Sequence, residues 1–249
     1  MRQKKLVLVI VGLLSLASAG CQQLRARDNL NKGVRAFNET NYQAAVDYFN
    51  AALELDPELV QAELYLATAY SQQFVPSALG EDNRRMASLA IEKFEGVLTR
   101  DPENTTAMAG LANIYQNTNN LDRARDYYIM QAEIAADSAV AQYSVGSLNW
   151  MIVFDKTVER EPEELSNLIE EGQQALDRAL SLNEEYEDAM TYKNLLYREA
   201  AALLPEDSDD ETVVAEREDL LAQADEWFNK AMETRKLLAE REAANLVGQ

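Results

Sequence analysis

Histidine is absent from this sequence, and cysteine occurs once, at Cys21. Without histidine, the chain can form neither a catalytic triad that uses an imidazole base nor a metal site with imidazole ligands. A single cysteine also excludes an internal disulfide and a zinc site built from thiolates. Any enzyme would have to rely on carboxylates, lysine, serine, threonine or tyrosine. We therefore expect no catalytic site, no metal, no other cofactor and no small-molecule substrate.

Basic residues are scarce as well. The chain has 23 Lys and Arg against 43 Asp and Glu, which gives a formal net charge of −20. A charge of this size and sign repels nucleic acids and anionic membrane surfaces. The composition predicts no nucleic-acid partner, and any attachment to a membrane must come from something other than basic side chains.

The first residues have the features of a bacterial export signal. Met1–Lys5 is basic, Leu6–Leu16 is mostly apolar, and Ala17–Cys21 ends the segment with small residues. The apolar part is too short for a typical transmembrane helix. Cleavage after Ala17-Ser18-Ala19 would release a soluble periplasmic or secreted protein.

Ser18-Ala19-Gly20-Cys21 also resembles the lipobox of bacterial lipoproteins. This resemblance implies that residues 1–20 are removed, that Cys21 is lipidated, and that residues 21–25 form a short linker. Gln22 follows the cysteine, where aspartate would be associated with retention in the inner membrane. The resemblance therefore implies an outer-membrane lipoprotein that faces the periplasm.

A small residue recurs at a fixed interval along the chain. Gly33 and Ala67 are 34 residues apart, and so are Ala112 and Gly146. A second series of small residues follows the first one: Ala45, Ala90, Ala124, Gly172 and Ala224. A period near 34 residues is typical of stacked helix-turn-helix arrays.

The segment Tyr42–Pro57 closely resembles the second helix of a tetratricopeptide repeat (TPR). The resemblance implies an all-α fold, a right-handed superhelical solenoid of about five TPR-like units. The expected units are residues 26–59, 60–104, 105–138, 139–186 and 187–238, and residues 239–249 form a helical cap or tail. Three units carry inserts between their helices, at about residues 74–85, 150–163 and 204–219. We expect no separate catalytic domain within residues 26–238.

In tetratricopeptide arrays the first helix of each unit lines a concave ligand groove. Transferring that pattern selects Leu64, Thr68, Gln72, Asn113, Gln116, Asn117, Tyr143, Ser147 and Trp150, with Thr191, Leu195 and Arg198 in the last unit. The amide side chains in the middle of this set can donate to and accept from the backbone of an extended peptide. None of these groove positions is a lysine, so we do not expect capture of a C-terminal carboxylate.

Two other segments have alternative interpretations. Trp150–Phe154 could anchor a partner, or the unit-four insert could fold back and bury it. Asp207, Asp209, Glu211 and Glu218 match four ligand positions of a calcium loop, but Thr212 replaces its required glycine. We therefore interpret Ser208 and Glu211 as a capping box that begins a helix.

These patterns favour a lipid-anchored scaffold or adaptor that faces the periplasm and mediates protein–protein interaction. Cell-envelope, secretion or pilus assembly is the setting that the resemblance implies. One alternative is a holdase-like protein that binds extended peptides transiently. A more remote alternative is an enzyme that depends on carboxylates, which would need two facing acids in one pocket.

Overall fold

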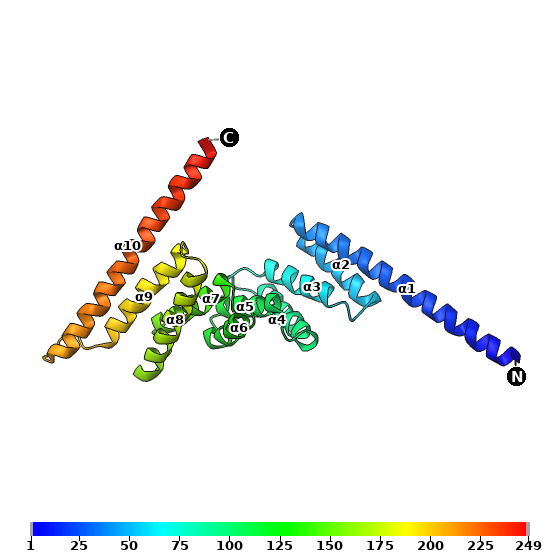
Figure 1. The fold of residues 1–249 in the computed structure, drawn as a ribbon. Helices are drawn as coiled ribbons and strands as arrows, with labels where there is room; N and C mark the ends of the chain where they lie inside the picture. The colour runs from blue at the N-terminus through cyan, green and yellow to red at the C-terminus, as the bar shows by residue number, and fades with distance from the viewer. Residues whose placement is uncertain (1, 248–249) are drawn as a thin grey trace. The chain divides into compact units, whose positions relative to one another are not determined.

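The computed structural model describes the backbone of residues 2–247 and the side chains of residues 20–246. Over that range the chain is all-helical, with ten α-helices and no strand (Figure 1). The helices divide into two compact units, Met1–Thr118 and Asn119–Gln249. The predicted signal peptide falls on the first part of the first helix, where the side chains up to residue 19 lie outside the described residues. No helix in the described part is apolar over enough length to span a membrane.

The N-terminal unit contains five helices, and each one packs on the next. They are α1 (Arg2–Asn38), α2 (Tyr42–Leu55), α3 (Val60–Gln73), α4 (Glu81–Arg100) and α5 (Thr105–Asn117). Asn41 begins α2, because its side-chain oxygen accepts a hydrogen bond from the backbone N–H of Ala44 at 3.3 Å. The helix ends at Leu55, since a residue that precedes a proline, here Asp56, disfavours the helical conformation.

The recurring small residue of the sequence marks a close contact between helices in this unit. Gly33 on α1 lies against the ring of Phe49 on α2, which is fully buried. A Cβ atom added at Gly33 would lie 2.4 Å from Phe49 Cε1. Glycine at this position therefore makes room for an aromatic ring in the core.

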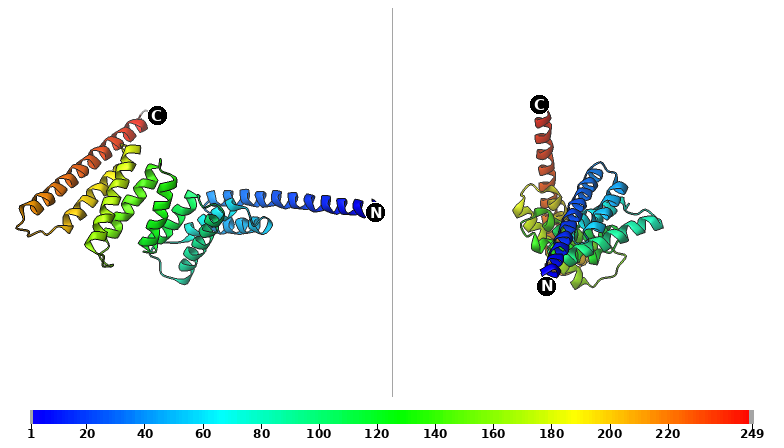
Figure 2. Two further views of the ribbon diagram at one scale, coloured as in Figure 1. Left: turned by 60° about the horizontal axis from the view of Figure 1, so that its bottom comes forward. Right: turned by 90° about the vertical axis from the view of Figure 1, so that its right-hand side faces the viewer.

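The C-terminal unit also contains five helices. They are α6 (Leu121–Ile134), α7 (Ala139–Phe154), α8 (Pro162–Leu182), α9 (Glu187–Leu203) and α10 (Glu211–Val247). The helices α7 to α10 lie side by side in sequence order (Figure 2), and α7 contacts both α8 and α9. Their core contains Leu148, Ile152, Leu176 and Leu196, each no more than 1% exposed.

A buried polar network joins α6, α7 and α8. Asn149 on α7 is fully buried and donates to the carbonyl oxygen of Leu168 at 2.9 Å and to Glu171 at 3.2 Å. Arg125 on α6 donates to Asn149 at 3.2 Å and pairs with Glu171 on α8. Because buried polar groups are stable only when they are paired, this network favours one arrangement of the three helices.

The extra residues of the inserts go largely into longer helices. The segment Trp150–Phe154, expected at the start of an insert, forms the last turn of α7. Ile152 and Val153 within it are only 1% exposed, and their burial favours continuation of the helix over a separate loop. The helices of the three affected repeats are joined by residues 74–80, 155–161 and 204–210.

Candidate functional site

Five aromatic side chains lie together where α7 meets α9. We call Tyr143, Trp150, Phe154, Tyr186 and Tyr192 the α7–α9 aromatic surface. The Tyr143 ring lies 4.9 Å from that of Tyr186 and 5.6 Å from that of Tyr192, between ring centroids. Trp150 lies 5.3 Å from Tyr192, edge to face, and stacks on Phe154 at 5.0 Å. These are favourable geometries for aromatic pairs, so the rings hold one another in place.

The surface is only partly covered by protein. The rings of Tyr143, Trp150 and Tyr192 are half-buried, and Phe154 is 57% exposed. Burial raises the pKa of the Tyr143 phenol well above its ordinary value, and the neighbouring Tyr192 and Asp188 add to the shift. The Tyr143 phenol is also hydrogen-bonded to Tyr192. The result is a rigid aromatic patch with polar hydroxyl groups.

The groove residues predicted on α7 lie along this surface. Tyr143 and Trp150 belong to it, and Ser147 lies one helical turn from each of them, with its hydroxyl donating to the carbonyl oxygen of Ser144 at 3.2 Å. Tyr143, Ser147 and Trp150 therefore lie on one face of α7.

The face predicted for α9 differs from the one that meets α7. Tyr192 makes the ring contacts with α7, whereas Arg198 donates to Asn194 at 2.9 Å and pairs with Asp225 of α10 at 2.6 Å. Sequence reasoning missed Tyr192 because the last repeat has Asn194 where the others have a small residue, so the helix face was poorly fixed. Aromatic residues in consecutive first helices were the signal that could have found it.

The other predicted groove residues belong to the N-terminal unit. Leu64, Thr68 and Gln72 lie on α3, and Asn113, Gln116 and Asn117 lie on α5, which contacts α3. Asn113 and Asn117 are exposed, and Asn117 donates to the backbone and side-chain oxygens of Asn113 at 2.9 and 3.0 Å. Since these contacts are local to one helix, the exposed amides can exchange them for contacts with a partner.

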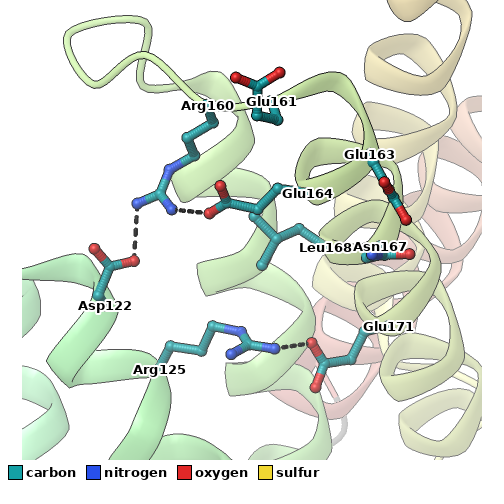
Figure 3. A pocket seen from close by; sticks show the side chains of 9 residues that line it. All are labelled: Asp122, Arg125, Arg160, Glu161, Glu163, Glu164, Asn167, Leu168 and Glu171. Carbon is teal, nitrogen blue, oxygen red and sulfur yellow. Dashed lines mark hydrogen bonds and ion pairs between the residues drawn. The ribbon is translucent and has the colours of Figure 1, made fainter.

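An open pocket of about 460 Å³ lies between α6 and the start of α8 (Figure 3). Arg160, from the preceding loop, pairs with Asp122 at 2.8 Å and also with Glu164, while Arg125 pairs with Glu171. These three carboxylates each face an arginine, so the pocket is held by ion pairs. Glu161 and Glu163 line the same pocket outside these ion pairs.

The acidic segment before α10 begins a helix. Asp210 accepts hydrogen bonds from the backbone N–H and the hydroxyl of Thr212, at 2.9 and 2.7 Å. These bonds lower the pKa of the Asp210 carboxyl. The sequence predicted Ser208 as the capping residue, but Asp210 caps the helix instead. Asp210 directly precedes the helix, and aspartate is as good a cap as serine. Among the described side chains, no group of three potential ligands is arranged to hold a metal ion.

Cys21 lies on α1 and is exposed, as are the four residues that follow it. Residues 21–25, predicted as a short linker, lie within α1.

Comparison with known proteins agrees with this architecture. Family models described as tetratricopeptide repeat match residues 29–59 and 86–145. These two segments carry the tetratricopeptide-repeat pattern. Repeats of this kind generally serve as non-enzymatic scaffolds that bind protein or peptide partners.

Several solved structures share the fold at low sequence identity. One is the MamA protein, with 16% identity, a TM-score of 0.63, and coverage of 87% of this chain and 94% of that one. YrrB, described as a TPR protein with an unusual peptide-binding site, has 15% identity, a TM-score of 0.56, and coverage of 84% and 90%. PilF of Pseudomonas aeruginosa has 14% identity, a TM-score of 0.54, and coverage of 91% and 90%. No curated protein matches the sequence.

Proposed function

We propose that this protein is a lipid-anchored scaffold that faces the periplasm and holds a protein partner on the α7–α9 aromatic surface. The setting that we propose is cell-envelope, secretion or pilus assembly. The observation that carries the proposal is the cluster itself: interlocked aromatic rings that are half-buried within the unit and still reach solvent.

Aromatic side chains contribute much of the binding energy at protein interfaces, because they bury a large area and lose little conformational entropy. Here the contacts among Trp150, Tyr192 and Tyr143 fix the rings before a partner arrives, which reduces the entropic cost of binding. YrrB, which has a similar fold, is described as having a peptide-binding site, and this supports the same class of function.

The proposed anchor is a lipid on Cys21. The thiol is exposed, and the net charge of −20 gives the chain no electrostatic attraction to an anionic membrane. Ala26, which is fully buried in the N-terminal unit, follows Cys21 by only five residues, so the scaffold would lie close to the outer membrane.

The proposal is tested by affinity capture of the full chain from detergent-solubilised cells, with quantitative mass spectrometry. The test variants are Phe154→Lys, at a largely exposed side chain, and Trp150→Ala. Ile134→Ala is the matched control, because Ile134 is an exposed apolar residue of α6 in the same unit. Asn113→Lys/Asn117→Lys examines the amide residues of the N-terminal unit. Circular dichroism verifies that each variant is folded.

We expect one partner in near-stoichiometric amount, lost in Phe154→Lys and Trp150→Ala and retained in Ile134→Ala. A partner lost only in Asn113→Lys/Asn117→Lys would overturn the assignment to the α7–α9 aromatic surface. A diffuse set of peptides, unaffected by any variant, would overturn the scaffold and support the holdase-like alternative.

A further inference from the structure

The last helix of the C-terminal unit has one covered face. Ala224 and Ala231 of α10 are at most 3% exposed, and Thr234 donates to the sulfur of Met190 on α9 at 3.6 Å. Over the residues of the C-terminal unit that the structure describes, α10 packs against α9 alone. A helix of 37 residues is thus paired along one side only.

A second apolar stripe runs along α10 beside the covered face. Val214, Leu221, Phe228 and Met232 follow one another at intervals of seven and four residues, which places them on one side of an α-helix. Val214 is 38% exposed, Phe228 is 49% exposed and Met232 is 48% exposed. Ala239 and Leu246, the latter 71% exposed, continue the same stripe. This spacing is typical of the apolar residues through which two helices pack along their length, which we call the seam.

We propose that this stripe packs against the same stripe of a second copy of the chain, with the two α10 helices antiparallel and a two-fold axis near Lys230. In this register Phe228 meets Met232 of the second copy, Leu221 meets Ala239, and Val214 meets Leu246. The apolar residues therefore pair along the whole helix, as a two-fold symmetric interface requires.

Charge selects the antiparallel arrangement. Residues 214–226 contain five acidic residues and one basic residue, whereas residues 234–246, which they face in this register, contain three basic residues and two acidic ones. Parallel helices would place the two acidic halves together, and antiparallel helices place each acidic half beside a basic half.

The same register pairs two charged residues on the seam. Asp225 meets Arg235 of the second copy, and their side chains are 67% and 60% exposed. Each now holds a partner on α9, Arg198 for Asp225 and Glu187 for Arg235. Exposed ion pairs of this kind contribute little to stability, so each residue can share or exchange its partner at a small cost in free energy.

Cysteine cross-linking tests the register directly. The full chain in detergent, carrying Cys21→Ser so that no native thiol remains, is made as Phe228→Cys with one tag and Met232→Cys with another. Leu237→Cys is the matched control, since Leu237 is 45% exposed and lies on a different side of α10. The mixed proteins are oxidised under mild conditions, and the disulfide-linked pair that carries both tags is quantified.

We expect Phe228→Cys to cross-link to Met232→Cys far more than either cross-links to Leu237→Cys, because a disulfide needs Cβ atoms within about 4.5 Å. Preferential cross-linking of Phe228→Cys to itself would indicate parallel helices and overturn the proposal. Equal yields for all mixtures would also overturn it.

A second measurement follows self-association without a disulfide. Sedimentation of the full chain in detergent is compared with that of Phe228→Glu and Leu237→Glu. Phe228→Glu places a charge at the centre of the interface in both copies, and we expect it to weaken self-association by at least about tenfold. Leu237→Glu should leave it unchanged. A monomeric parent chain, or equal dissociation in both variants, would contradict the antiparallel dimer.

Discussion

Tyr143 shows how one side chain links the candidate site to the stability of its unit. Its phenol is half-buried among Tyr192, Tyr186 and Asp188, and this environment raises its pKa. In the unfolded chain the phenol has its ordinary pKa of about 10. Above that pH the unfolded chain releases the proton while the folded chain keeps it. Stability is therefore fully present below about pH 10 and falls as the pH rises further.

We predict that Tyr143→Phe reduces this alkaline loss of stability, because it removes the group that ionises only on unfolding. The measurement is the free energy of unfolding in urea at neutral pH and above pH 10, for the parent chain and the variant. Tyr48→Phe, at an exposed tyrosine of α2, is the control. An unchanged difference between the two pH values in Tyr143→Phe would show that Tyr143 does not couple ionisation to folding.

Single residues also show the limits of the sequence pattern. Gly146 and Gly172, which belong to the two recurring series of small residues, lie at a close contact between helices. The repeat pattern includes them because it depends on packing that the repeats share. Tyr192 was missed, since its role depends on the ring of Tyr143 in the preceding repeat. The interval between small residues does not report such a contact, whereas the aromatic residues of consecutive first helices do.

At the level of helices, the crossing of α7 and α8 depends on Gly146. A Cβ atom added there would lie 2.4 Å from Leu176 Cγ and 3.0 Å from the carbonyl oxygen of Gly172. Alanine would favour an isolated helix by about 1 kcal/mol relative to glycine. In this crossing it would instead force two helices apart, because backbone atoms cannot move aside as a flexible side chain can.

We predict that Gly146→Ala destabilises the C-terminal unit by roughly 2–3 kcal/mol, as overpacking of a tight core does. Urea unfolding followed by circular dichroism measures the effect. Ser144→Ala, a half-buried position on the same helix, is the control and should change stability little. Gly146→Ala with stability equal to that of the parent would mean that the helices are not packed as closely as the structure shows.

The helices themselves followed from the sequence more reliably than the segments between them. α2 ends just before Asp56-Pro57 and α4 just before Asp101-Pro102, as expected for a residue that precedes a proline. The lengths of α7 and α8 could not be predicted from the repeat pattern. Residues beyond the pattern extend a helix only when their side chains can be buried in the core. Ile152 and Val153 are buried in this way, and the repeat pattern does not predict their burial.

For the whole molecule, the resemblance to tetratricopeptide repeats predicted an all-α solenoid, and the helices and the structural relatives confirm the fold. The membrane attachment that we propose is a separate matter, because it depends on one atom, the sulfur of Cys21. The net charge of −20 opposes electrostatic attraction to anionic lipids. Membrane binding should therefore depend entirely on the lipid.

We predict that the mature protein begins at Cys21, carries acyl chains there, and sediments with membranes through a wash at high salt. A single acyl chain binds a membrane only weakly, so retention through the wash requires more than one chain. Cys21→Ser should move the protein to the soluble fraction and leave the helical content unchanged, because the side chain is exposed. Intact-mass spectrometry separates the two cleavage interpretations: lipidation gives an N-terminus at a modified Cys21, whereas cleavage after Ala19 gives an unmodified chain that begins at Gly20. The second mass, found for a soluble parent protein, would replace the anchored scaffold with a freely diffusing one.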